Sequence, residues 1–103
     1  MADDTLDRIL DGALDAVSRH GLGKLEMRDV STRSGVSRGT VYRYFPGRDA
    51  LLTQLAQREG LRFQRRMVAA IENAPPGPER ILEAVRQATR EVREHPVLQR
   101  LLD

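Results

Sequence analysis

The sequence predicts an all-α fold, and three observations support that prediction. Apolar residues recur at helical spacing along most of the 103 residues, and no segment shows the strict alternation of a half-buried strand. Gly21, Gly35, Pro46 and Pro96, together with the run 74–78, divide the chain into helix-length segments. A hydrophobic share of 40% suits a single small core. We expect a three-helix bundle followed by a long helix and by further helical segments.

The first predicted helix covers residues 5–19. Its apolar residues recur at i, i+3, i+4, i+7, i+8 and i+11 and form one continuous face: Leu6, Ile9, Leu10, Ala13, Leu14 and Val17. Acidic residues recur every four positions beside that face, which we interpret as a solvated surface rather than a metal site: Asp3, Asp7, Asp11 and Asp15. Gly21 ends the helix, and residues 21–25 are expected to form a loop.

Two short helices are predicted over 27–34 and 38–44, with Gly35 between them. Gly35 fits the position after a helix end, where a left-handed backbone is needed and glycine has no Cβ to clash. Val36 would pack back on the preceding helix, and Ser37 is a favourable N-cap for the next. This pattern is typical of a helix–turn–helix, whose second helix lies in the major groove of duplex DNA.

The distribution of charge favours a nucleic-acid partner for this segment. The net charge is only +2, but residues 1–16 sum to −4 and residues 19–48 sum to +5. Positive charge is therefore concentrated on the helix–turn–helix, as binding to phosphate requires. Within it, Val41 and Phe45 have the apolar character and spacing of core residues.

The rest of the chain is expected to form a long helix over 48–73, a linker over 74–78, a helix over 78–94 and, after Pro96, a short apolar segment over 97–103. The long helix would be roughly 38 Å long. The following residues are expected to be buried: Leu51, Leu52, Leu55, Ala56, Leu61, Phe63, Met67, Val68, Ile71, Ile81, Leu82, Val85 and Val92. The arginines of the long helix are expected to be solvated rather than to extend the basic field: Arg58, Arg62, Arg65 and Arg66.

Several classes of function are disfavoured by composition. The chain has no cysteine, which excludes disulfides, thiolate zinc sites and thiol nucleophiles. Its two histidines, His20 and His95, have no nucleophile or metal-ligand set nearby in sequence, and we expect each to lie at a helix end. No apolar run is long enough for a membrane span. We expect a cytoplasmic protein without cofactor, metal site or enzymatic activity.

The residues resemble the TetR-type bacterial transcription regulators. The resemblance lies in the amphipathic first helix ending in glycine, in Val30, and in three ordered motifs covering residues 34–52: Ser34-Gly35-Val36-Ser37, Gly39-Thr40-Val41-Tyr42-Arg43-Tyr44-Phe45 and Pro46-Gly47-Arg48-Asp49-Ala50-Leu51-Leu52. It covers about residues 5–55 well and the long helix more loosely. It implies a homeodomain-like helix–turn–helix.

The resemblance also implies a set of DNA-contacting residues: Arg28, Ser37, Arg38, Gly39, Thr40, Tyr42, Arg43, Tyr44 and Arg48. Arg38 would read a base, with guanine the favoured partner. Arg28 and Arg48 would hold phosphate, and Gly39 would let the helix approach the bases. Tyr42 has a buried position as its alternative, and Arg33 is expected to be exposed to solvent. Glu26 stands where many relatives have threonine and is a poorer N-cap.

The implied organisation is a DNA-binding domain over 1–47, a connecting helix over 48–73, and over 74–103 the start of a C-terminal domain for ligand binding and dimerisation. The implied function is a repressor that binds a palindromic operator as a homodimer and is released by a small-molecule effector, whose pocket is mostly absent from these residues. The alternative is a helical interaction module that pairs with another protein through residues 98–102.

Overall fold

The computed structural model describes residues 4–102, with side chains described for residues 4–99. Within that range every regular element is helical, so the all-α prediction is confirmed. The chain forms two compact units, the first ending at Ala56 and the second beginning at Gln57. This boundary lies inside one continuous helix, α4 (Arg48–Asn73).

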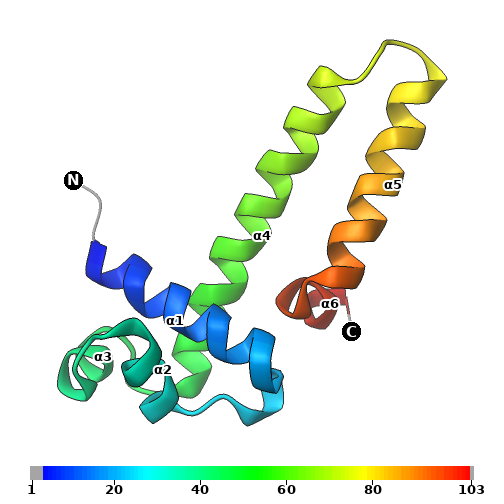
Figure 1. Cartoon of the computed structure of the whole chain (residues 1–103). Coiled ribbons are helices and arrows are strands. Elements are labelled where there is room, and N and C mark those ends of the chain that lie inside the picture. Colours follow the sequence, from blue (N-terminus) through cyan, green and yellow to red (C-terminus); the bar gives the residue numbers. More distant parts are fainter. Residues whose placement is uncertain (1–3, 103) are drawn as a thin grey trace. The chain divides into compact units, whose positions relative to one another are not determined.

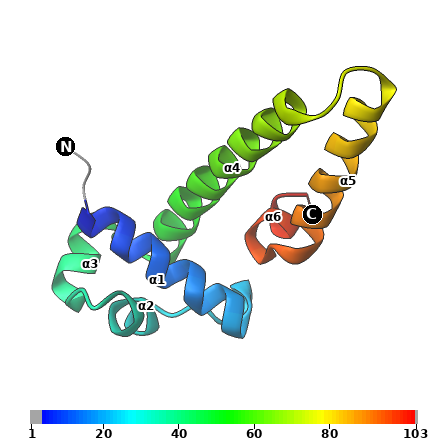
Figure 2. The same ribbon diagram turned by 45° about the horizontal axis from the view of Figure 1, so that its top comes forward.

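The first unit contains α1 (Asp4–His20), α2 (Met27–Ser34), α3 (Arg38–Tyr44) and the first part of α4. The predicted bounds of α2, α3 and α4 are confirmed, and α1 is one residue longer at each end than predicted. A 3-10 turn, η1 (Leu22–Lys24), lies in the segment expected to be a loop. Figures 1 and 2 show α1 lying across α2, with α3 beyond the turn that follows α2.

The core of the first unit is assembled from one face of each helix. α1 contributes its apolar face, as its periodicity predicts, and the other helices contribute one or two residues each. The buried apolar residues are Ile9, Leu10, Ala13, Ala16, Val17, Leu25, Val30, Val36, Val41, Phe45, Leu51 and Leu55. This core fixes the positions of α2 and α3.

A glycine lets α1 approach the end of α2 closely. A Cβ placed on Gly12 would lie 2.9 Å from both the Cβ and the backbone nitrogen of Ser34. Atoms that close overlap, and one of them belongs to the backbone. The crossing of α1 and α2 therefore depends on the missing side chain of Gly12.

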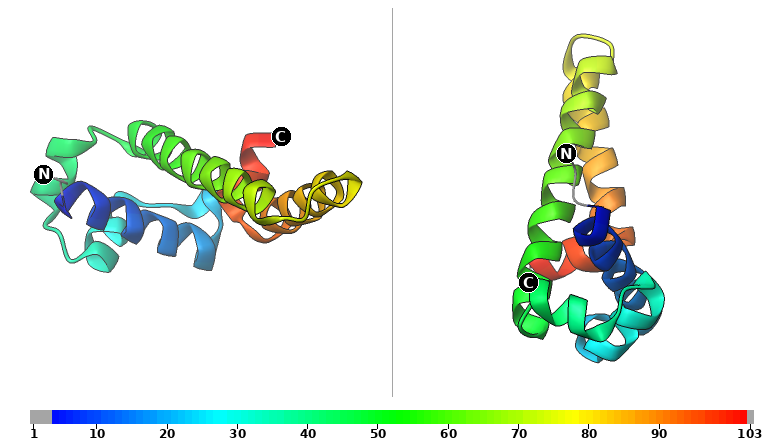
Figure 3. Two further views of the ribbon diagram at one scale, coloured as in Figure 1. Left: turned by 90° about the horizontal axis from the view of Figure 1, so that it is seen from above. Right: turned by 90° about the vertical axis from the view of Figure 1, so that its left-hand side faces the viewer.

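The second unit contains the rest of α4, α5 (Pro78–Glu94) and α6 (Pro96–Leu102). α4 and α5 run side by side in opposite directions, joined by a short turn (Figures 1 and 3). Pro78 opens α5, where its missing amide proton costs nothing. Arg66 of α4 bonds Glu91 of α5 at 2.8 Å, contrary to the expectation of a solvated arginine.

Several residues expected to be buried on α4 and α5 are exposed instead. They are Leu61, Val68 and Ile71 on α4, and Ile81, Leu82 and Val85 on α5, with Ile81 71% exposed. Helical periodicity identifies residues that share a face but does not show whether another element covers that face. Of the other residues discussed above, Asp3 and the side chains of Leu101 and Leu102 lie outside the described part of the chain.

Glu59 is a buried acidic residue on α4 and binds two of the arginines expected to be solvated. Its Oε2 accepts hydrogen bonds from Arg58 Nε at 2.9 Å and from Arg62 Nη1 at 3.3 Å, and its Oε1 lies 3.1 Å from His95 Nε2. Burial raises the pKa of this carboxyl group, but the hydrogen bonds from His95 and Arg58 outweigh burial and leave the pKa below its usual value.

His95 lies between α5 and α6 and caps the second of them. Its Nδ1 lies 3.2 Å from the backbone nitrogen of Val97 and 3.4 Å from that of Leu98, so it accepts their N–H groups. In the neutral ring Nε2 then carries the proton and donates to Glu59. The predicted helix-end position is confirmed, and the same ring joins α4 to the start of α6.

Candidate nucleic-acid interface

The turn between α2 and α3 has the backbone geometry that its sequence predicts. Gly35 has φ 70° and ψ 17°, in the left-handed region, and its N–H donates to Ser31 O at 3.1 Å. Ser31 Oγ donates to Val36 O at 2.6 Å, and Ser34 Oγ accepts from Val36 N at 3.2 Å. Ser37 caps α3, since its Oγ accepts the N–H of Thr40 at 3.3 Å. The predicted roles of Gly35 and Ser37 in the turn are confirmed.

α3 has one face in the core and one in solvent. Val41 is fully buried and Phe45 nearly so, as predicted, and together they hold the helix against the first unit. Tyr42 is 44% exposed, so the buried alternative for this residue is wrong. The exposed residues of the helix are Arg38, Gly39, Tyr42, Arg43 and Tyr44. All of them are among the residues expected to contact DNA.

Thr40 is held by its neighbours on this helix. Its Oγ1 accepts a hydrogen bond from Ser37 Oγ at 3.0 Å and another from Arg43 Nη2 at 3.0 Å. A hydroxyl has two acceptor lone pairs and one proton, so both lone pairs of Thr40 are in use. Toward a ligand this side chain can act only as a donor. Phosphate oxygens are acceptors, so this arrangement suits a phosphate contact.

Two further arginines of the expected set lie outside α3. Arg28, in the first turn of α2, is strongly exposed and lies 3.4 Å from Glu26 Oε2. Glu26 makes no side-chain hydrogen bond to the start of α2, which confirms that it is a poor cap. Arg48 Nη2 donates to Leu22 O at 2.6 Å and so joins the start of α4 to η1. Both guanidinium groups keep further donors for phosphate.

Arg33 is the centre of an ionic network, and the expectation that it is solvent-exposed is wrong. It donates to Asp15 at 2.7 Å and to Asp29 at 3.2 Å, and its Nη2 lies 3.1 Å from His20 Nε2. The hydrogen bond from Arg33, then that from Arg19, lowers the pKa of Asp15. The bond to Asp15 is in turn the main cause that raises the pKa of Arg33. Asp15 therefore belongs to the junction of α1 and α2 and not simply to a solvated surface.

This geometry is a helix–turn–helix with a polar, basic outer face. Residues 9–55 match the model of a family described as bacterial regulatory proteins, tetR family. These residues therefore form a tetR-family helix–turn–helix unit. In the described part of the chain, no group of three or more acidic, histidine or cysteine side chains could hold a metal ion, and no helix is long and apolar enough to cross a membrane.

Curated relatives carry related names. The chain is 35% identical over 92 residues to the HTH-type transcriptional regulator Rv1255c of Mycobacterium tuberculosis, covering 89% of this chain and 46% of that protein. It is 37% identical over 94 residues to the HTH-type transcriptional repressor KstR of Rhodococcus jostii, covering 88% of this chain and 42% of KstR. The chain thus spans about half the length of the curated relatives it matches.

Two solved structures share this fold. The fatty acid degradation regulator FadR from Bacillus halodurans superposes with a TM-score of 0.76 at 22% identity, over 95% of this chain and 52% of that one. At this identity the match shows the fold alone. A TetR-family transcriptional regulator, HI0893, from Haemophilus influenzae gives a TM-score of 0.65 at 27% identity, over 92% and 52% of the two chains.

The sequence did not point to two residues that shape the turn of this tetR-family unit, Arg8 and Gly12. Gly12 carried a signal, because a glycine inside a helix costs about 1 kcal/mol relative to alanine, and close packing is one reason for its presence. Arg8 carried none, because it contacts residues 26 and 27 positions away in the chain. The DNA contacts assigned to the nine residues named earlier stay predictions.

Proposed function

We propose that the chain is a sequence-specific DNA-binding regulator of transcription, acting as a repressor in the bacterial cytoplasm. One observation supports this most directly. α3 is anchored by buried Val41 and Phe45 and turns arginine, tyrosine and glycine outward beside a left-handed turn. An outward face of that composition on the second helix of a helix–turn–helix suits the major groove.

Each exposed residue type has a role in this proposal. Arg38, in the first turn of α3, would bind guanine with two parallel hydrogen bonds. Gly39, around which the structure has open space, would allow close approach to the bases. Thr40 would donate to phosphate, and Tyr42 would contact a phosphate or a thymine methyl group. Arg28, Arg43, Tyr44 and Arg48 would contact the DNA backbone. Ser37 would contact it through its backbone N–H group, because its hydroxyl proton is donated to Thr40.

Selection of bound DNA from a random pool tests the proposal. We expect a near-palindromic sequence whose two halves are read by two copies of the chain, with helices roughly 34–36 Å apart in successive major grooves. Selection of a single half-site would support sequence-specific DNA binding but contradict binding as a homodimer. Recovery of no preferred sequence at low salt would overturn the function.

Two arginine variants separate base reading from phosphate binding. Arg38→Ala should weaken binding to the selected DNA site by about 1–3 kcal/mol and relax the sequence preference at one base pair. Arg48→Ala should weaken binding to all DNA sequences alike. It should also reduce the salt slope, the dependence of the logarithm of the binding constant on the logarithm of salt concentration, by about 1. Arg86→Ala, on the exposed surface of α5, removes the same charge and should change neither the affinity for DNA nor the salt slope. Equal losses on selected and random DNA for Arg38→Ala would remove its assigned role.

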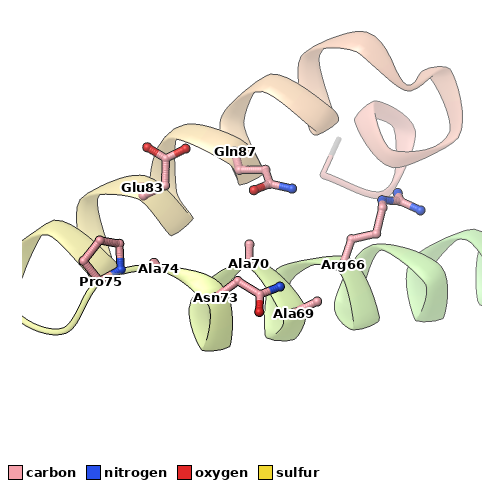
Figure 4. Close-up of a pocket in the computed structure, with 8 residues that line it drawn as sticks. All are labelled: Arg66, Ala69, Ala70, Asn73, Ala74, Pro75, Glu83 and Gln87. Carbon is pink, nitrogen blue, oxygen red and sulfur yellow. The ribbon is translucent and has the colours of Figure 1, made fainter.

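A small-molecule effector is also part of the proposal. A pocket of about 550 Å³ opens between α4 and α5 (Figure 4). It is lined by Arg66, Ala69, Ala70, Asn73, Ala74, Pro75, Glu83 and Gln87. This pocket would be the part of the effector site that these residues supply. Binding there would move α4, whose first residues belong to the DNA-binding unit. A compound that releases labelled DNA from the wild type should fail on Ala70→Trp, which fills the pocket, while DNA affinity itself is unchanged.

A second candidate function is a protein-interaction module. The exposed apolar side chains of α4 and α5 favour it, whereas Leu98, expected to present such a surface, is buried. A DNA titration at two salt concentrations beside a measurement of molecular mass distinguishes the two functions. Association with another protein and no DNA binding at low salt would favour the second.

A further inference from the structure

The turn between α2 and α3 is held from outside by an arginine of α1. Arg8 Nη2 donates to two successive carbonyl oxygens, Ser34 O at 3.3 Å and Gly35 O at 3.2 Å. Ser34 is the last residue of α2 and Gly35 is the left-handed residue that follows. One guanidinium nitrogen thus bridges the two carbonyl groups at which the chain changes direction.

The contact has a favourable electrostatic basis. The last carbonyl groups of a helix have no partner inside the helix and carry its partial negative charge. A guanidinium is always protonated, offers only donors and is planar, so it suits two adjacent carbonyl oxygens. The other side-chain hydrogen bonds of this turn are made by serines of α2 itself, Ser31 and Ser34. Arg8 therefore adds a restraint that relates the turn to a second helix.

Gly12 makes this contact geometrically possible. It lies four residues after Arg8, one helical turn along the same face of α1. Since a Cβ on Gly12 would meet Ser34 at 2.9 Å, the two helices cross with their backbones in contact at this point. The Arg8 side chain spans the remaining distance to the turn. Gly12 thus sets the separation of α1 and α2, and Arg8 links α1 to the C-terminal end of α2 by hydrogen bonds.

We propose that Arg8 is a positioning residue for DNA recognition, which fixes the turn and so the direction in which α3 presents its outer face. The inference rests on the proposed DNA-binding function. Arg8 acts through Ser34 and Gly35 and makes no base contact. α3 begins three residues after Gly35, so a small rotation at the turn displaces Arg38 and Tyr42 relative to the core that anchors α1.

The test compares Arg8→Met with Arg19→Met on the selected DNA site and on random DNA at several salt concentrations. Arg19 is an exposed arginine of the same helix, paired with Asp15, so the two variants lose the same charge. Arg8→Met should bind the selected site about tenfold more weakly than Arg19→Met, which corresponds to losing one hydrogen bond to a charged group. Affinity for random DNA and the salt slope should match the control. Arg8→Lys, which keeps the charge and a donor group, should recover most of the loss.

The outcomes are distinct. A salt slope smaller by about 0.9 for Arg8→Met would make Arg8 a phosphate contact and overturn the positioning role. Equal binding by Arg8→Met and Arg19→Met, with only a lower melting temperature for the former, would reduce Arg8 to a structural residue and also overturn it. Failure of the wild type to select any sequence would instead overturn the proposed function. The amide resonances of Gly35 and Val36 provide a readout without DNA, and they should shift in Arg8→Met and not in Arg19→Met.

Discussion

Replacing each of two helical glycines with alanine should have opposite effects on stability. Alanine is favoured over glycine in a helix by up to about 1 kcal/mol. Gly39 of α3 has no neighbouring atom within 4 Å of the position that an alanine methyl group would take, so Gly39→Ala should keep that gain. At Gly12 the added Cβ meets the Cβ and the backbone nitrogen of Ser34 at 2.9 Å, so α1 and α2 must move apart. Overpacking of this kind costs about 1–3 kcal/mol.

Both variants gain the same helix propensity, so they should differ by the overpacking cost, about 1–3 kcal/mol in the free energy of unfolding, with Gly12→Ala the less stable. Urea unfolding followed by circular dichroism measures the difference directly. Gly39→Ala should also bind DNA more weakly than the wild type despite its higher stability, because it adds a methyl group to the outer face of α3. Equal stability of Gly12→Ala and Gly39→Ala would show that α1 and α2 do not cross as closely as described, and the reasoning would fail.

Three further predictions concern stability. Leu55→Ala should cost about 2–5 kcal/mol, because the side chain is fully buried, whereas Leu61→Ala on the exposed side of α4 should stay within about 0.5 kcal/mol in the same urea titration. Ser37→Ala should lower stability by about 1 kcal/mol through loss of the cap on α3, and Ser37→Asp should restore it in thermal unfolding. The pKa of Glu59 is lowered in the folded chain, so its contribution is present above its usual value of 4.5 and is lost as pH falls below it. Glu59→Gln should therefore be less stable at neutral pH and lose less stability between about pH 5 and about pH 3; an unchanged acid profile would contradict this.

Local chemistry explains why much of the first unit could be predicted. The ends of α2 and α3 follow from Gly35 and Ser37, whose effects on the backbone depend only on their immediate neighbours. The buried face of α1 follows from the spacing of its apolar residues, because the other helices of the first unit do pack against that face. The exposed residues of α3 are those that remain once Val41 and Phe45 are assigned to the core.

The failures share a different cause, which is distance along the chain. Arg8, Arg33 and Glu59 find partners 18 to 36 positions away, and no local pattern encodes such pairs. The apolar faces of α4 and α5 failed for a related reason. Ile81 has the spacing of a core residue, but burial requires a neighbour, and amphipathic spacing carries no information about one.

The hydrogen bonds around Thr40 have a consequence for the thermodynamics of binding. A long side chain that is immobilised on association costs about 0.5–1.5 kcal/mol in lost conformational entropy. Arg43 and Ser37 are already held on the Thr40 hydroxyl before any ligand arrives. Part of that entropy is lost when the chain folds, so less remains to be lost on the DNA. Thr40→Val, which keeps the shape and removes the hydroxyl, should make association entropically more costly, and calorimetry can measure the difference.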